Sequence, residues 1–188
     1  MSGYTGNWTN FNFLRTVGLR NRSSPYYLKV KDTKELKFDV IGDIHGCATE
    51  LEELLISLGY LEIGRCFRRS DGRRVVFLGD YIDRGLEVRR TLEIVRSMVD
   101  NGQAYAILGN HELNALRFHQ RGPDGEWMRP HTPSKVSQHQ STLDQIVHPD
   151  PISWRKWMDW FAELPLWLEF PEFRGSYWRL NGFRAAWN

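Results

Sequence analysis

Three short stretches of the sequence combine glycine with side chains that can bind metal ions or phosphate. They read GDIHG at residues 42–46, GDYIDRG at residues 79–85 and GNHE at residues 109–112. The glycines permit tight turns and a close approach of neighbouring backbone. The chemically useful side chains in these stretches are Asp43, His45, Asp80, Asp83, Arg84, Asn110 and His111.

A mixture of carboxylate, imidazole and amide groups is typical of a site for two divalent ions of intermediate hardness, such as manganese, iron or zinc. A carboxylate shared by two ions about 3.5–4 Å apart occurs in enzymes that displace a leaving group at phosphorus. The guanidinium of Arg84 has the planar shape that matches phosphate oxygens. The three stretches therefore predict metal-assisted phosphoryl chemistry.

Each stretch follows an apolar run of the kind found in buried strands, at residues 36–41, 75–78 and 104–108. Helical spacing of apolar residues follows each of them, at residues 47–59, 87–102 and 111–120. This alternation predicts an α/β fold with a largely parallel sheet. Ligands of such sheets bind beyond the carboxyl ends of the strands, and all three stretches fall there.

The remaining patterns complete the expected fold. The Asp71-Gly72 pair predicts a hairpin before the second strand, and residues 121–133 are rich in turn-forming residues and predict a loop. Helical patterns resume at residues 134–147 and 153–165, the second with an aromatic stripe that we expect in the core. Residues 166–170 predict a further strand.

The three stretches resemble the signature of the calcineurin-like metallophosphoesterases, in particular the phosphoprotein-phosphatase branch. The flanking sequences RRVVFLGDYIDRG, RPHTPSKVSQHQ and AELPLWLEF are similar to bacterial phosphatases of the PrpE and symmetrical diadenosine-tetraphosphate-hydrolase kind. The resemblance covers about residues 38–173 and implies the αββα sandwich of that family. It also implies a hydrolase in which a metal-bound hydroxide attacks phosphorus in a two-metal site.

The same resemblance implies a role for each site residue. Asp43 and His45 would hold one metal ion, Asp80 would bridge the two, and Asn110 would hold the second and contact phosphate. The catalytic set would comprise Arg84 on the phosphate and His111, oriented by Asp83, as the proton donor to the leaving oxygen. The ions are expected to be Mn²⁺, with Fe, Zn or Ni as alternatives.

Members of the family carry further histidine ligands on later strands, whereas no histidine follows His148 in this sequence. We therefore expect a chain that is truncated or frameshifted at its C-terminal end, with its second sheet incomplete. The expected organisation is a basic, flexible extension at residues 1–35, the N-terminal part of the phosphoesterase domain at residues 36–173 and a divergent tail at residues 174–188.

Composition limits the location and partners of the protein. The 188 residues are 41% hydrophobic and carry a formal net charge of +2, and no apolar run is long enough to span a membrane. Only two cysteines are present, which fits a reducing cytoplasm better than a disulfide-stabilised secreted domain. We expect a cytoplasmic protein without membrane partners.

The expected substrate is a phosphoprotein or a dinucleoside polyphosphate. A catalytically impaired remnant that binds only metal or a partner is the alternative. A nucleic-acid-binding role is not expected, because the basic residues of segment 1–35 are not interleaved with stacking motifs.

Overall fold

The structure is a computed structural model, and it describes residues 27–30, 37–170 and 174–176. Its first sheet contains three parallel strands in the order β2-β5-β6, with bounds Phe38–Ile41, Arg74–Phe77 and Ala104–Ala106. Two helices connect these strands, α2 at Ala48–Ser57 and α3 at Val88–Asp100. The α/β fold with a parallel sheet is therefore confirmed.

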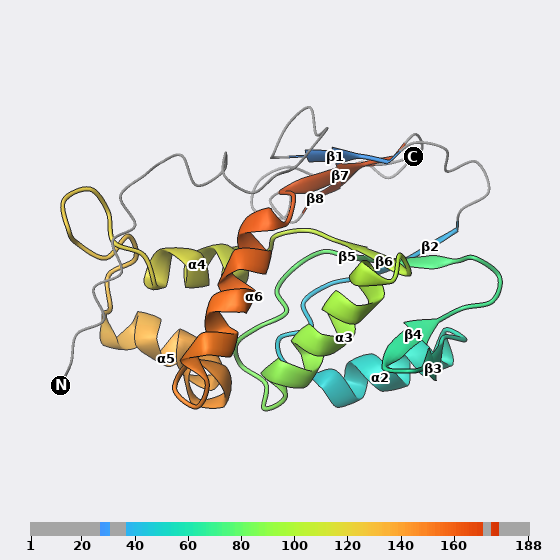
Figure 1. Cartoon of the computed structure of the whole chain (residues 1–188), viewed down its shortest axis with the longest axis horizontal. Coiled ribbons are helices and arrows are strands. Elements are labelled where there is room, and N and C mark those ends of the chain that lie inside the picture. The colour runs from blue at the N-terminus through green and yellow to red at the C-terminus, as the bar shows by residue number, and fades with distance from the viewer. Residues whose placement is uncertain (1–26, 31–36, 171–173, 177–188) are drawn as a thin grey trace.

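A second sheet lies over the first (Figure 1). Its strands follow the order β1-β7-β8, with β1 at Tyr27–Lys29 parallel to β7 at Trp167–Glu169, and β8 at Arg174–Ser176 antiparallel to β7. The strand predicted for residues 166–170 is thus confirmed as β7. Strand β1 lies within the segment 1–35 that was expected to be an extension, and this strand contributes to the sandwich.

The central strand β5 shows why two layers of core form. Side chains alternate between the faces of a strand. Val75 and Phe77 pack into the main core with residues of α2 and α3, whereas Val76 packs into a smaller core with Leu168 of β7 and Phe170 directly after it. Figure 1 shows α2 and α3 on the side of the first sheet that faces away from the second sheet.

Three helices follow the first sheet: α4 at Asn110–Phe118, α5 at Pro133–Thr142, which continues as the π-helix η1 at Leu143–Val147, and α6 at Pro151–Glu163. The aromatic stripe of α6 is buried in the main core as predicted, through Trp154, Trp157, Trp160 and Phe161. Proline at the start of α5 and of α6 is favourable, because the first helical N–H needs no partner within the helix.

The predicted hairpin is in a different place. Strands β3 at Leu61–Ile63 and β4 at Cys66–Arg68 pair across Gly64 and Arg65, not across Asp71 and Gly72. Both Gly64 and Arg65 have positive φ, which a two-residue turn between twisted antiparallel strands favours. Asp71 instead accepts the N–H of Arg73 in a turn that leads into β5.

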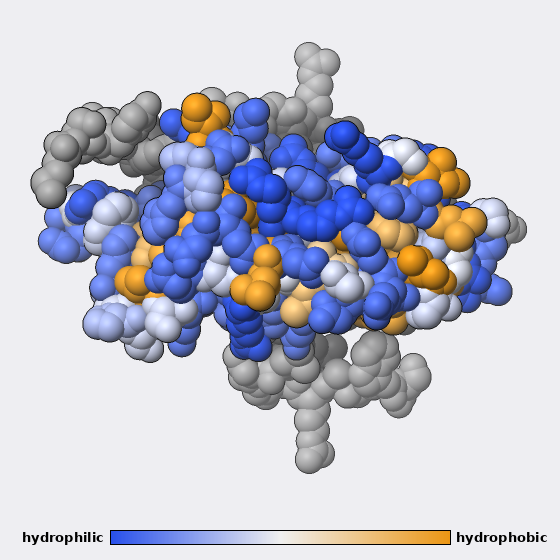
Figure 2. All heavy atoms as spheres, turned by 90° about the horizontal axis from the view of Figure 1, so that it is seen from below, coloured by the Kyte–Doolittle hydropathy of each residue, from blue (hydrophilic) through white to orange (hydrophobic). Residues whose placement is uncertain are grey.

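The surface seen in Figure 2 is mostly hydrophilic, and its hydrophobic side chains form small separate groups. Exposed apolar side chains of the described residues include Leu61 and Ile63 of β3. No helix in the described part of the chain has the length and apolar character needed to cross a lipid bilayer.

Candidate functional site

The loops that follow β2 and β5 are joined by backbone hydrogen bonds beyond the carboxyl ends of the strands. The N–H of His45 donates to the carbonyl oxygen of Asp80 at 2.8 Å, and the N–H of Gly46 donates to that of Tyr81 at 2.9 Å. The N–H of Gly85 donates to the carbonyl oxygen of His45 at 2.8 Å. The first two predicted stretches are therefore held together by main-chain contacts as well as by their side chains.

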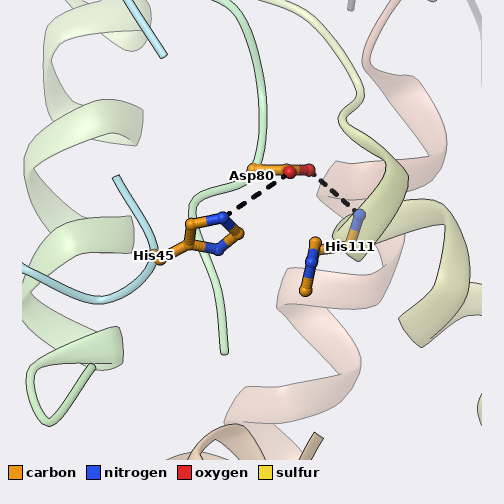
Figure 3. A group of neighbouring side chains, drawn as sticks. All are labelled: His45, Asp80 and His111. Carbon is orange, nitrogen blue, oxygen red and sulfur yellow. Dashed lines mark hydrogen bonds and ion pairs between the residues drawn. The ribbon is translucent and has the colours of Figure 1, made fainter. Parts of the chain in front are cut away.

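Three side chains converge at this edge of the sheet (Figure 3). One ligand atom from each of His45, Asp80 and His111 lies within 4.8 Å of the other two. Nδ1 of His45 lies 3.1 Å from the carbonyl oxygen of Ile82, to which it donates, so Nε2 is the nitrogen of this ring that can serve as a ligand. That Nε2 lies 3.8 Å from Oδ2 of Asp80. The imidazole of His45 and the buried carboxylate of Asp80 fit a divalent ion of intermediate hardness, with His111 beside them.

Asp80 is fixed by its neighbours. Its side chain is buried, and Oδ1 accepts the backbone N–H of His111 at 3.1 Å, while Oδ2 faces His45. One carboxylate thus connects the residues that follow β2 with the first turn of α4.

The other predicted site residues surround this group. Asp43 is exposed in the loop after β2, Asn110 is the first residue of α4 beside His111, and Arg84 is exposed directly after Asp83. Among the described histidine, cysteine and acidic residues, the group of close ligand atoms contains His45 and Asp80 but not Asp43. The same group contains His111, which the sequence predicted as a proton donor rather than a ligand.

His111 and Asp83 form a close pair. Nδ1 of His111 lies 2.6 Å from Oδ2 of Asp83, and both side chains are largely buried. Burial opposes a charge on the ring, but the hydrogen bond to Asp83 and the negative charges of Asp80, Asp83 and Glu112 together raise the pKa of His111. Burial alone would raise the pKa of Asp83, yet its hydrogen bonds lower it well below the usual value. The pair therefore favours an ionised carboxylate beside a protonated imidazole.

Asp83 has further partners that the sequence did not predict. Its Oδ1 accepts from Nδ1 of His139 at 2.7 Å and from the hydroxyl of Thr142 at 2.6 Å, and the same hydroxyl accepts the N–H of Asp83 at 3.0 Å. Both residues come from α5. The only sequence signal was the helical pattern of residues 134–147, which places His139 and Thr142 on neighbouring turns of one helix face.

Glu112 is the other site residue that sequence reasoning missed. Its carboxylate is fully buried and accepts four backbone N–H groups: those of Gly109 and Asp80 on Oε2 and those of Tyr81 and Ile82 on Oε1. Burial and the charge of Asp80 raise the pKa of Glu112 to about 7, although the backbone donors act in the opposite direction. Glu112 therefore holds the loop after β5 against the first turn of α4. In the sequence, Glu112 is marked only by its place as the last residue of the GNHE stretch.

The backbone of the site is strained. The described part of the chain has six non-glycine residues with positive φ, and all but Arg65 are predicted site residues: Asp43 at 54°, His45 at 48°, Asp80 at 57°, Asp83 at 71° and Arg84 at 62°. A side chain in this region costs about 1 kcal/mol or more, less for aspartate than for most residues. Such strain persists where surrounding contacts fix the chain and is concentrated at functional sites.

Two glycines allow the strand ends to approach closely. A Cβ on Gly109 would collide with the backbone nitrogen and carboxylate of Asp80, and a Cβ on Gly79 would collide with the backbone of Gly109. Gly42 occupies the corresponding place after β2, and a Cβ added there would lie 3.4 Å from Leu78, an ordinary contact distance. Of the three glycines that begin the site stretches, Gly79 and Gly109 therefore have no room for a side chain, whereas Gly42 does.

The two-sheet fold and the strand-end site define a calcineurin-like phosphoesterase. The sequence profile of that family matches residues 36–185, and the chain belongs to it. Among individual relatives, the chain is 44% identical over 85 residues to bis(5'-nucleosyl)-tetraphosphatase PrpE (asymmetrical) of Oceanobacillus iheyensis, an alignment that covers 45% of this chain and 34% of that protein. The corresponding PrpE of Halalkalibacterium halodurans is 42% identical over 83 residues, covering 44% of this chain and 34% of the relative.

These alignments span about a third of the length of the relatives. Among solved structures, a single-site mutant of a cold-active protein tyrosine phosphatase superposes with a TM-score of 0.50 at 14% identity, covering 80% of this chain and 44% of that chain. At this identity the likeness shows the fold. The resemblance to calcineurin-like metallophosphoesterases and to PrpE is confirmed.

Proposed function

We propose that this chain hydrolyses phosphate esters or anhydrides at the edge of the sheet where β2, β5 and β6 end. The observation that supports the proposal most directly is the convergence of His45, Asp80 and His111 within 4.8 Å, with His111 hydrogen-bonded to Asp83. The alternative, a remnant that binds metal or a partner without turnover, is separated from it by the assay below.

The donor set fits divalent ions, with manganese as the first choice. Asp43, His45, Asp80 and Asn110 would hold two ions, with Asp80 shared between them. Bound ions would supply positive charge to the phosphoryl oxygens and a nucleophile from water near neutral pH. Oδ2 of Asp80 and Nε2 of His45, which lie 3.8 Å apart, provide two ligand atoms for this role.

His111 and Arg84 act on the substrate itself. The ring of His111, fixed by Asp83 through Nδ1, presents Nε2 as the donor of a proton to the leaving oxygen, a contribution worth roughly 10²–10⁴ in rate. The exposed guanidinium of Arg84 binds phosphate oxygens through its two parallel N–H groups.

The substrate class follows from the relatives, whose name is bis(5'-nucleosyl)-tetraphosphatase. We propose a dinucleoside polyphosphate as the substrate, ahead of a phosphoprotein. A nucleotide substrate agrees with the cytoplasmic location expected from the sequence.

The test is a hydrolysis assay on the purified full chain after removal of metal with a chelator. Substrates are p-nitrophenyl phosphate, diadenosine tetraphosphate and a phosphoserine peptide, each with and without added Mn²⁺. We expect Mn²⁺-dependent turnover that a chelator abolishes and that Asp80→Asn reduces at least 100-fold, while the exposed control Asp159→Asn keeps full activity. Stoichiometric Mn²⁺ binding without turnover on any substrate would overturn the proposal and support the remnant.

A further inference from the structure

Four side chains form one continuous line of hydrogen-bonding contacts that leads away from the site. His111 contacts Asp83 at 2.6 Å, Asp83 contacts Nδ1 of His139 at 2.7 Å, and Nε2 of His139 lies 3.2 Å from Nε2 of His119. The Asp83 carboxylate lies between His111 and the two histidines farther from the site, His139 and His119. Neither belongs to the candidate metal ligands.

The direction of the hydrogen bond between Asp83 and His139 is determined by the groups themselves. An ionised carboxylate can only accept, so Nδ1 of His139 must carry the proton that points at Asp83. Nε2 of His139 lies 3.2 Å from Nε2 of His119, so one of these two nitrogens donates a hydrogen bond to the other. Burial, together with nearby histidines, lowers the pKa of His119 to about 3, so that ring is neutral and has one N–H and one accepting nitrogen.

Packing leaves these rings little freedom. His139 is only 3% exposed, and the indole of Trp154 packs against both rings, with centroids 5.9 Å from His139 and 5.2 Å from His119. Phe118 also contacts both, at 5.2 Å in each case. A ring held this way cannot turn to exchange its two nitrogens without disturbing the core.

The helix that carries His139 also clamps the loop that carries Asp83. The hydroxyl of Thr142 bridges the N–H and the carboxylate of Asp83, and the side-chain amide of Gln145 donates to the carbonyl oxygen of Gly85 at 2.9 Å and accepts the N–H of Val88 at 2.7 Å. Ser141 donates to the same carbonyl oxygen of Gly85. Segment α5–η1 therefore fixes the strained backbone of residues 83–85 from outside the metal group.

We infer that His139 is a positioning residue for the proposed hydrolysis. His139 holds Oδ1 of Asp83, so that Oδ2 remains aligned with Nδ1 of His111 and the other nitrogen of His111 faces the substrate. This inference rests on the proposed function for its kinetic consequence. Its structural consequence, the fixed orientation of the His111 ring, can be measured without turnover.

The test compares two substitutions at one position. Asparagine places its side-chain N–H₂ close to where the Nδ1–H of histidine lies, whereas leucine has no donor. We expect His139→Leu to lower kcat about 10–100-fold with KM changed less than about two-fold, and His139→Asn to recover most of that loss. His148→Leu, a change at an exposed histidine of the same helical segment, should match the unmodified chain.

Imidazole nitrogen NMR gives the second readout, recorded on the full chain with Zn²⁺ because Mn²⁺ is paramagnetic. We expect a slowly exchanging Nδ1–H signal of His111 in the unmodified chain and in His139→Asn, and its loss in His139→Leu. His119→Leu, which keeps the Nδ1–H of His139 as the donor to Asp83, should preserve the His111 signal. Unchanged His111 signals in folded His139→Leu would overturn the inference. Absence of turnover in the unmodified chain, with the NMR pattern as expected, would contradict the proposed function alone.

Discussion

The backbone N–H of Asp80 donates to Oε2 of Glu112 at 2.9 Å, which connects the central metal-ligand candidate to the first turn of α4. Glu112 accepts three further backbone N–H groups from Gly109, Tyr81 and Ile82. A buried carboxylate with four donors acts here as a structural bridge between two strand ends. Asp80 has a positive φ of 57°, and its hydrogen bond to Glu112 is one of the contacts that hold this conformation.

Replacement of Glu112 by glutamine should therefore destabilise the whole fold. The amide keeps the size of the side chain, but its NH₂ group faces backbone N–H groups that then lose their acceptor. An unsatisfied buried donor costs about 1–3 kcal/mol, so we expect the free energy of unfolding to fall by about 2–5 kcal/mol. Urea denaturation followed by circular dichroism measures this. Glu163→Gln, at the exposed end of α6, is the matched control, and equal midpoints for the two variants would contradict the bridge.

The three glycines that begin the site stretches should respond differently to alanine. Gly109→Ala places a methyl group against Asp80 and Glu112, and Gly79→Ala adds the strain of a φ of 92° to a collision with Gly109. We expect both changes to weaken Mn²⁺ binding at least about ten-fold, because Asp80 must move. Gly42→Ala meets only Leu78 at ordinary contact distance and should leave binding within two-fold.

Calorimetric titration of Mn²⁺ into the three alanine variants separates this explanation from a general need for small residues. Equal losses of Mn²⁺ affinity in all three variants would contradict this explanation. They would mean that every one of these loops requires glycine, and not only the place where the ends of β5 and β6 approach each other. Folded fractions are checked by thermal unfolding, so that a loss of binding is not confused with a loss of fold.

The strand-end arrangement could be predicted from the sequence because two independent signals agree. Apolar runs end in Gly-Asp or Gly-Asn, and the alternation of strand and helix requires these ends to share one edge of a parallel sheet. His45 and Asp80 lie together for that reason. The pairing of His111 with Asp83 was implied only by the family resemblance, and the structure places the two atoms 2.6 Å apart.

Other features depend on contacts between residues far apart in the chain. His139 reaches Asp83 from 56 positions away through α5, and no periodicity in the sequence specifies which loop a helix will contact. The hairpin at Gly64 and Arg65 was missed because Asp71-Gly72 is the stronger local turn signal, while strand pairing was decided by burial of Cys66 and Phe67 against α3. Domain boundaries and the individual roles of the site residues remain predictions.

The buried ring of His119 should make stability depend on pH. Its pKa is lowered to about 3 in the folded chain, from a usual value of 6.5, because burial opposes the charged form. Between these two pH values the unfolded chain binds the proton and the folded chain does not, so stability is full above about pH 6.5 and falls as the pH drops towards 3. The slope reaches about 1.4 kcal/mol per pH unit.

We expect His119→Gln to reduce the loss of unfolding free energy between pH 7 and pH 5 by about 1–2 kcal/mol, measured by urea denaturation at both pH values. His148→Gln is the control, because that side chain is exposed in the folded chain. An identical pH dependence in His119→Gln and the unmodified chain would show that the buried ring is protonated or that another group dominates.

His111 has two possible roles in this geometry, and one substitution separates them. Its ring lies within ligand distance of His45 and Asp80, yet Nδ1 is committed to Asp83. If His111 donates a proton and holds no metal, His111→Gln should lower kcat by roughly 10²–10⁴ while Mn²⁺ affinity changes little. If His111 is a ligand, the affinity for Mn²⁺ should fall together with kcat, as expected for His45→Gln.

We expect His111→Gln to lower kcat without a matching loss of Mn²⁺ affinity. The reason is that the hydrogen bond to Asp83 favours a protonated ring, and a protonated imidazole cannot bind a metal ion. Calorimetric Mn²⁺ titration and turnover of p-nitrophenyl phosphate on the same preparations decide between them.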